Sequence, residues 1–138
     1  MNPSLTVLIP TLNNWQQLQT TVLSMVRNTE YPLRILILNN SPNANPDEIA
    51  WIDQTIKGAN FDGLEVIHLG GNKGWMGAIN VGLAVTKTPF VCLLNDDVVF
   101  IPGMNIFWRK LIDRFENPVV AAVGPSSNFV MGSQNISL

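Results

Sequence analysis

The sequence predicts an α/β fold in which successive strand–helix–strand units build a buried, mostly parallel central sheet. Short apolar runs alternate along the chain with segments whose apolar residues recur every three or four positions. Apolar runs without polar alternation are typical of strands that are covered on both faces, as they are in a parallel sheet. The chain has 138 residues, 46% of them hydrophobic, which is enough for one ordinary domain with a single core.

The first two strands are predicted from apolar runs over residues 5–9 and 33–38. The first run stops at Pro10 and a polar loop over residues 11–14. A helix is expected between the strands, because apolar residues recur on one helical face and Pro32 ends the segment. These apolar residues are Trp15, Leu18, Val22 and Met25.

A second helix is predicted after the polar loop over residues 39–42. Asn45 supplies a cap residue, and Pro46 suits the first helical position. Two acidic residues then favour the first turn, and isoleucines follow at helical spacing. These isoleucines are Ile49, Ile52 and Ile56.

The third predicted strand, residues 64–69, runs into a glycine-rich loop over residues 70–74. A helix rich in small residues is expected over residues 75–85. The fourth strand, residues 90–94, follows Pro89, whose missing N–H does little harm at the start of a strand.

An amphipathic helix and a fifth strand are predicted after the fourth strand. The helix is indicated by six apolar residues at helical spacing: Met104, Phe107, Trp108, Leu111, Ile112 and Phe115. The fifth strand is the apolar run over residues 119–123. We expect residues 1–124 to form one domain and residues 125–138 to form a polar tail.

Composition and charge argue against several classes of protein. Charged residues make up 13% of the chain and the net charge is −2, so the basic surface that nucleic acid or an anionic membrane requires is not predicted. The N-terminus has no basic segment before its short apolar run, and no apolar stretch reaches the roughly 20 residues that span a bilayer. The lone Cys92 cannot form an internal disulfide. We therefore expect a cytoplasmic protein without a nucleic-acid partner or a membrane span.

Unusual polar residues follow four of the predicted strands. In an open parallel sheet, ligands bind beyond the carboxyl ends of the strands, where the loops diverge. The sequence places there residues 10–13, residues 39–41, the glycine-rich loop and residues 95–97. We therefore expect these four loops to meet at one edge of the sheet and to form a single site.

The adjacent carboxylates of Asp96 and Asp97 indicate a site for a divalent cation. Side by side at the end of a strand they repel each other, and a shared cation removes that repulsion. Mg²⁺ and Mn²⁺ commonly take only one or two protein carboxylates and complete their shells with water and substrate phosphates. The pair therefore predicts a partner that contains a diphosphate. The alternative is an acidic turn that faces solvent.

The glycine-rich loop has two interpretations. Four glycines, Gly70, Gly71, Gly74 and Gly77, would let the backbone approach an anion closely at the start of the following helix. Alternatively, the loop is a flexible connection between strand and helix, and Gly77, Ala78 and Gly82 only allow the helix to pack closely on the sheet. No glycine follows the first strand and no Walker A motif is present, so dinucleotide-binding dehydrogenases and P-loop NTPases are not favoured.

Three further residues are weaker candidates for chemistry. His68 and Cys92 lie within apolar strands and are expected to be structural. Trp75 is the tryptophan beside the glycine-rich loop, but core packing is the favoured interpretation for it as well. One His and one Cys cannot supply a Cys/His metal cluster, and no Ser-His-Asp order is present.

Together these loops resemble the family 2 glycosyltransferases. Residues 9–13, Ile-Pro-Thr-Leu-Asn, are similar to the Pro-x-x-Asn turn after the family's first strand, and residues 38–41 resemble the end of its second strand, with Asn39 in place of an acid. Residues 71–83 are similar to the family's Asn-x-Gly-aromatic-x-Gly-Ala-x-Asn-x-Gly stretch. Residues 93–97, Leu-Leu-Asn-Asp-Asp, resemble its DXD-type metal motif. The resemblance covers nearly the whole chain, but only the N-terminal half of the family's domain.

The resemblance implies a GT-A-like, Rossmann-like three-layer sandwich in which residues 1–124 bind a nucleotide sugar. Residues 125–138 stand where an acceptor-binding region begins in the family. The implied nucleotide-binding residues are Pro10, Thr11, Asn13, Asn39, Ser41, Asn72, Lys73, Gly74, Asn95 and Asp96. Asp97 is the implied direct ligand of Mn²⁺ or Mg²⁺, with Asp96 beside it.

The implied reaction is inverting transfer of a sugar from a nucleoside-diphosphate donor, expected to be UDP-linked, to an unknown acceptor hydroxyl. The family's general base comes from its second half, and Asp113 and Glu116 match it neither by motif nor by position, so no base is predicted. Three roles stay open. The chain can be a transferase, alone or completed by a second chain or a second copy of itself; a nucleotide-sugar-binding module without turnover; or a structural protein with an empty site.

Overall fold

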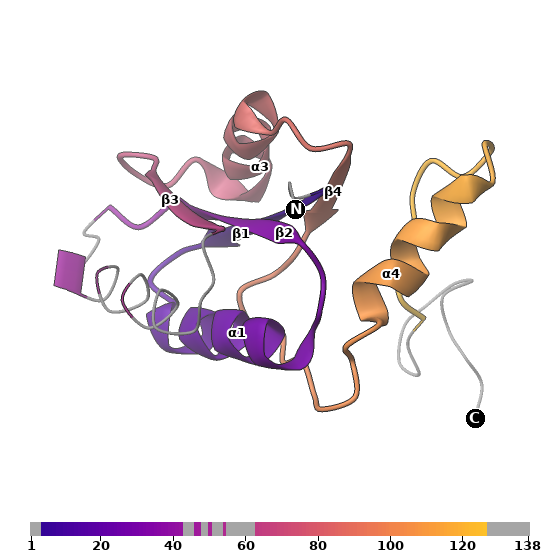
Figure 1. Ribbon diagram of the computed structural model, residues 1–138. Coiled ribbons are helices and arrows are strands. Elements are labelled where there is room, and N and C mark those ends of the chain that lie inside the picture. Colours follow the sequence, from indigo (N-terminus) through magenta and orange to yellow (C-terminus); the bar gives the residue numbers. More distant parts are fainter. Residues whose placement is uncertain (1–3, 43–45, 48–49, 51–53, 55–62, 127–138) are drawn as a thin grey trace.

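The computed structural model describes residues 4–42, 46–47, 50, 54 and 63–126, and its centre is a four-stranded parallel sheet (Figure 1). The strands are β1 (Leu5–Thr11), β2 (Leu33–Asn39), β3 (Leu64–His68) and β4 (Phe90–Leu93). They lie in the order β3-β2-β1-β4, and each neighbouring pair is parallel. The predicted α/β fold and the first four predicted strands are therefore confirmed.

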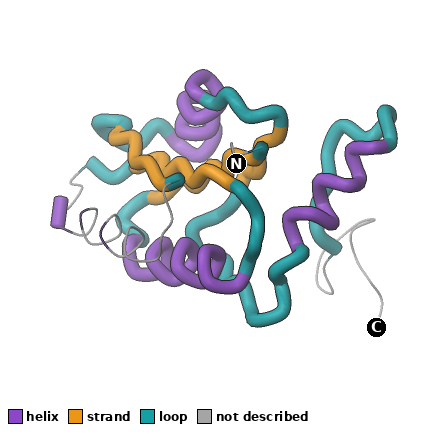
Figure 2. Tube along the Cα trace, viewed as in Figure 1, coloured by secondary structure: helices purple, strands orange, loops and turns teal. Residues whose placement is uncertain are grey.

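Two helices cover opposite faces of the sheet, which makes three layers (Figures 1 and 2). Helix α1 (Trp15–Asn28) lies on one face and α3 (Gly74–Val85) on the other. The apolar stripe predicted for the first helix is buried in α1, with Leu18, Val22 and Met25 each 0% exposed.

The alternation of side chains along each strand divides the core into two clusters. On the α1 face, Val7 and Ile9 of β1 pack with Ile35 and Ile37 of β2. On the α3 face, the intervening leucines of β1 and β2 pack against Ala78 and Ile79. This division follows because successive residues of a strand point to opposite faces.

Helix α3 lies close to the sheet at a glycine. A Cβ atom added at Gly82 would lie 2.9 Å from Leu38 Cδ1 and 3.0 Å from Leu8 Cδ1. Both leucines are fully buried, so neither has free space to move into. The packing role that the sequence suggested for Gly82 is thereby confirmed.

The amphipathic helix predicted after β4 is shorter than the apolar stripe that predicted it, which runs from Met104 to Phe115. It consists of α4 (Phe107–Ile112) and a 3-10 turn, η1 (Asp113–Glu116). Trp108 is buried and stacks near Phe100, with 5.5 Å between ring centroids. Phe115 contacts Phe90, the first residue of β4, with ring centroids 5.2 Å apart. This segment therefore packs near the amino end of β4.

The predicted fifth strand over residues 119–123 is wrong, because none of these residues is in a strand and Val119 is 83% exposed. A strand forms only where a neighbour supplies hydrogen-bond partners. Here the Val120 N–H donates to the Asn117 carbonyl at 3.0 Å, and the Val119 N–H donates to Asn117 Oδ1 at 3.2 Å. The backbone turns back on Asn117 instead of pairing with β4.

Two other predictions fall partly outside the described residues. Of the helix predicted after Asn45, the structure describes Pro46, Asp47, Ala50 and Gln54, and all four are helical. Most of the predicted polar tail, residues 127–138, is not described. Among the helices of the described residues, none has the length and apolar character needed to cross a membrane.

The direction in which strands are added to the sheet reverses between β1 and β4. From β1 the chain proceeds to β2 and β3 on one side, and then returns to β4 on the other side. In open α/β sheets, the loops diverge at such a switch in strand order, and ligands bind at the carboxyl ends of the strands there. The topology therefore predicts a ligand site at the loops that follow Thr11 and Leu93.

Candidate functional site

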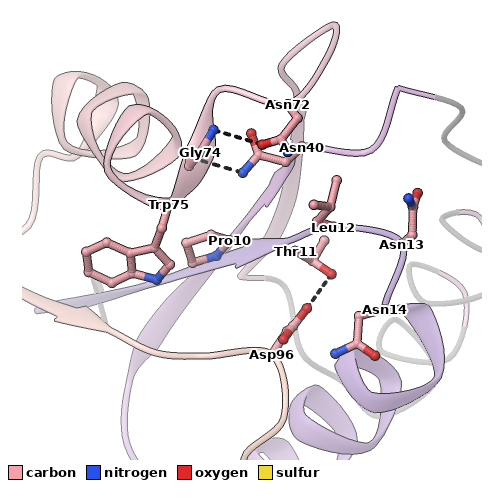
Figure 3. Close-up of a pocket in the computed structure, with 10 residues that line it drawn as sticks. All are labelled: Pro10, Thr11, Leu12, Asn13, Asn14, Asn40, Asn72, Gly74, Trp75 and Asp96. Carbon is pink, nitrogen blue, oxygen red and sulfur yellow. Dashed lines mark hydrogen bonds between the residues drawn. The ribbon is translucent and has the colours of Figure 1, made fainter.

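A pocket of about 490 Å³ lies at the carboxyl edge of the sheet (Figure 3). Its walls come from the loop after β1, the first residue after β2, the loop into α3 and the turn after β4. The lining residues are Pro10, Thr11, Leu12, Asn13, Asn14, Asn40, Asn72, Gly74, Trp75 and Asp96. The volume falls within the roughly 300–1,000 Å³ that is typical of small-molecule sites.

Asp96 is held at the pocket by a threonine from the neighbouring strand. Thr11 Oγ1 donates a hydrogen bond of 2.6 Å to Asp96 Oδ2 (Figure 3). Because β1 and β4 are adjacent, the last side chain of β1 reaches the turn that follows β4. A short hydrogen bond to a carboxylate is among the stronger polar contacts in proteins, so it fixes the orientation of this oxygen.

Helix α1 fixes the backbone of the same turn from below. Thr21 is fully buried, and its Oγ1 donates to the Asp96 carbonyl at 2.8 Å and accepts from the Val98 N–H at 3.0 Å. One turn later, Ser24 Oγ accepts from the Phe100 N–H at 3.0 Å. The sequence indicated no such role for Thr21, because a threonine at this helical spacing resembles part of an ordinary polar face.

Asn40 joins the loop after β2 to the start of α3. It is 4% exposed, its Oδ1 accepts from the Lys73 N–H at 3.0 Å, and its Nδ2 donates to the Gly74 carbonyl at 3.3 Å. Asn72 Oδ1 accepts from the Gly74 N–H at 2.8 Å. Gly74 has φ +69°, a conformation that side-chain-bearing residues rarely adopt, so this position favours glycine. These two asparagines thereby set the shape of this wall of the pocket.

A second hydrogen-bonded chain lies beside the pocket wall and ends at Asn13. Asn39 is 1% exposed, and its Oδ1 accepts from the Ser41 N–H at 2.8 Å. Ser41 Oγ in turn accepts from the Asn13 N–H at 2.7 Å. Asn13 has φ +53°, a left-handed conformation that asparagine tolerates better than most residues. On its other side, Asn39 Nδ2 lies 3.1 Å from His68 Nδ1.

The structure brings together six of the ten residues predicted to bind nucleotide. Those that line the pocket are Pro10, Thr11, Asn13, Asn72, Gly74 and Asp96. Asn39 and Ser41 are buried beside it, Lys73 approaches it through its backbone, and Asn95 and the predicted metal ligand Asp97 are exposed on either side of Asp96.

Four lining residues were not predicted: Leu12, Asn14, Asn40 and Trp75. The favoured interpretation of Trp75 as core packing is wrong, because its side chain is 44% exposed and lines the pocket (Figure 3). Its proximity in sequence to the glycine-rich loop was the signal that could have identified it.

The donor set suits a cation that shares its ligands with a substrate. The described residues contain no group of three or more His, Cys, Asp or Glu side chains that could hold a metal ion by themselves. Asp96 lines the pocket, and Asp97 is the exposed residue that follows it in the same turn. Two carboxylates with phosphate oxygens and water make a common shell for Mg²⁺ or Mn²⁺, so these residues fit such an ion.

Cys92 takes no part in the site. Its side chain packs against the core on the α1 face, and burial raises the pKa of its thiol to about 11. A thiol with this pKa stays protonated near neutral pH and is a poor nucleophile and metal ligand. The interpretation of Cys92 as core packing is confirmed.

Residues 6–136 match the family model described as glycosyl transferase family 2. A pre-mycofactocin glycosyltransferase from Mycobacterium tuberculosis is 34% identical over 120 residues, and the same match occurs in two strains. The match covers 87% of the chain and 23% of that relative. The chain therefore spans about a quarter of the length of the curated relatives that it matches.

Solved glycosyltransferases share the fold. A mannosyltransferase from Pyrobaculum calidifontis, solved in complex with GDP-Man and Mn²⁺, superposes with a TM-score of 0.72 over 87% of this chain and 34% of its own, at 17% identity. Residues 1–349 of S. aureus TarS give a TM-score of 0.63 at 20% identity, and the match covers 84% of this chain and 33% of that 1–349 chain. At these identities the similarity establishes the fold, which is therefore that of the GT-A glycosyltransferases.

Proposed function

The chain belongs to glycosyl transferase family 2, and on that premise we propose that its pocket binds a nucleoside-diphosphate sugar, with UDP as the nucleotide, for metal-dependent, inverting transfer of the sugar. The observation that carries this proposal is the placement of Asp96. Its carboxylate is fixed by Thr11 at the switch point of the sheet, and its backbone is fixed by Thr21. Such restraint suits a carboxylate that must meet a charged ligand in one orientation.

In this proposal different residues of the pocket contact different parts of the nucleotide-sugar donor. Pro10, Thr11 and Asn13 contact the base and ribose, and the loop around Asn72 and Gly74 lies against the nucleotide. Asn39, Ser41 and Lys73 support these contacts from outside the lining, as their hydrogen bonds indicate. The complex of the Pyrobaculum mannosyltransferase with GDP-Man supports a nucleotide-sugar donor for a fold of this kind.

Asp97 and Asp96, flanked by Asn95, would hold Mn²⁺ or Mg²⁺. When bound, such an ion stabilises the negative charge that develops on the departing diphosphate. The protein's own contribution is to keep the acidic turn rigid before the donor arrives, through the threonines of β1 and α1. Fixed groups spend little energy on reorganisation during the reaction, and this favours catalysis.

A second function, donor binding without turnover, is favoured by the positions of the remaining acids. After Asp97 the described residues contain two acids, Asp113 and Glu116, both in η1. This turn packs through Phe115 against Phe90 at the amino end of β4, whereas the pocket lies at the carboxyl end. Neither acid is placed to take a proton from an acceptor, so the base would come from residues outside the described part or from a partner chain.

Calorimetric titration with UDP-sugars and GDP-sugars in the presence of Mn²⁺, followed by measurement of released sugar, separates the two functions. We expect Asp97→Asn to weaken metal-dependent binding, and Asp113→Asn, an exposed acid away from the pocket, to leave it unchanged. Metal-dependent binding with sugar release supports the transferase. Binding without sugar release, both with and without added acceptors, supports donor binding without turnover. If neither sugar nucleotide binds the wild-type chain, the proposal is refuted.

A further inference from the structure

His68 is the last residue of β3 and lies next to the last residue of β2. It was expected to be a structural residue of the strand, but it is exposed, and its Nδ1 lies 3.1 Å from Asn39 Nδ2. The contact joins two elements that are far apart in sequence and meet beside the pocket wall. The hydrogen bond that Asn39 accepts from Ser41 determines which atom donates in this contact.

The orientation of the Asn39 amide is fixed by a backbone N–H. Ser41 N can only donate, so the Asn39 atom at 2.8 Å from it must be the amide oxygen. The amide nitrogen therefore faces His68, and this nitrogen can also only donate. It follows that His68 Nδ1 is the acceptor and that the imidazole carries its proton on Nε2.

The chain of hydrogen bonds continues from Asn39 to the pocket. The same amide that meets His68 holds the Ser41 backbone, and Ser41 Oγ accepts from the Asn13 N–H at 2.7 Å. Asn13 lines the pocket in a left-handed conformation, φ +53°. A backbone in that region persists only where its surroundings hold it, and this chain supplies one of the restraints.

We infer that His68, as the neutral Nε2–H tautomer, is a positioning residue that acts through Asn39 and Ser41 to hold Asn13 at the pocket. His68 is not among the residues that line the pocket. Its effect on ligand binding rests on the proposed function, whereas the tautomer and the restraint on Asn13 are properties of the chain alone.

The tautomer is open to direct measurement, because His68 is the single histidine of the chain. Nitrogen-15 NMR of the wild-type protein at about pH 8, where an ordinary imidazole is neutral, should show a protonated Nε2 and an unprotonated Nδ1. Asn39→Asp replaces the amide donor with an acceptor, so the proton should move to Nδ1 or the ring should become doubly protonated. A wild-type ring with its proton on Nδ1, or an unchanged ring in Asn39→Asp, would overturn the inference.

Amide hydrogen exchange tests whether the restraint reaches Asn13. His68→Phe removes the acceptor, and we expect the Asn13 amide to exchange faster, while His68→Gln, which offers a carbonyl oxygen, restores protection. The Lys73 amide is an internal control, because it is held by Asn40 Oδ1, a different side chain of the same loop. Equal acceleration at Asn13 and Lys73 would indicate general loosening and would contradict the relay.

For the bound state, His68→Phe should weaken nucleotide binding about 2- to 12-fold, the effect of one lost hydrogen bond, with recovery in His68→Gln. Unchanged affinity in His68→Phe would refute the role of His68 at the pocket. If the wild-type chain binds no nucleotide, the proposed function fails, and the tautomer and exchange measurements still decide whether the relay exists.

Discussion

At the scale of single residues, the site depends on side chains that fix other groups more than on side chains that face the ligand. Asp96 illustrates this, because its carboxylate is oriented by Thr11 and its carbonyl by Thr21, from two different elements. A free carboxylate in an exposed turn would sample several rotamers and lose entropy when it met a ligand. The two threonines remove part of that cost in advance.

Thr11→Val tests the value of this orientation, since it removes the hydroxyl and keeps the shape of the buried side chain. We expect the affinity for a nucleoside diphosphate with Mn²⁺ to fall about tenfold, the typical effect of losing a hydrogen bond to a charged group. Thr11→Ser should keep most of the affinity. Isothermal titration calorimetry measures the difference.

Thr6→Val is a matched control for Thr11→Val. Thr6 is fully buried near the other end of β1 and bonds Thr88 Oγ1 at 2.8 Å, away from the pocket. Both variants lose one hydroxyl contact of the same strand, so both should lower the unfolding free energy. If both variants also lower the affinity for the ligand equally, the orientation of Asp96 by Thr11 does not contribute to ligand binding.

The site residues that could be predicted from the sequence are those whose residue type and position indicate a chemical role. The residues that were missed act through contacts between segments that are distant in sequence. Asp96 lies two residues after the apolar strand predicted over residues 90–94, and its pairing with Asp97 indicated a cation site. Asn40 and Thr21 are ordinary loop and helix residues in sequence, and their roles appear only when β2 meets α3 and α1 meets the turn after β4. Hydrogen bonds across such separations leave no local pattern.

At the scale of elements, apolar periodicity predicted the four paired strands and the two covering helices, because burial on the sheet imposes that periodicity directly. It failed for residues 119–123, where five small apolar residues have strand character but no neighbouring strand in the described structure. Strand formation depends on a partner elsewhere in the chain, so local composition does not decide it.

Helix α3 can lie close to the sheet because residue 82 is a glycine, so a larger side chain at this position should destabilise the fold. Gly82→Val adds three carbons against Leu8 and Leu38, and we expect it to lower the unfolding free energy by about 2 kcal/mol through overpacking. Ala84→Val makes a similar change at an exposed position of the same helix and should cost well under 1 kcal/mol. Urea denaturation compares the two variants. A Gly82→Val protein as stable as Ala84→Val would show that α3 can move away from the sheet freely.

At the scale of the whole molecule, the strand order determines where the proposed donor and cation would meet. The switch between β1 and β4 places the polar loop of one strand beside the acidic turn of the other. Helix α1 holds the acidic turn through Thr21, and the start of α3 is joined through Asn40 to the loop after β2. The described residues contain no third His, Cys, Asp or Glu that would form a metal-binding group with Asp96 and Asp97, so the proposed cation would take further ligands from the donor and from water.

This shared coordination predicts strong thermodynamic coupling between Mn²⁺ and a nucleoside diphosphate. Each ligand alone should raise the melting temperature little, and the two together should raise it by more than the sum, because each completes the other's site. Linkage requires that Mn²⁺ increase the affinity for the nucleotide by the same factor as the nucleotide increases the affinity for Mn²⁺. Asp97→Asn should abolish this excess and retain the small effect of the nucleotide alone. Additive shifts in the wild-type chain would mean that cation and nucleotide bind independently, and the acidic turn would then have no part in holding the diphosphate.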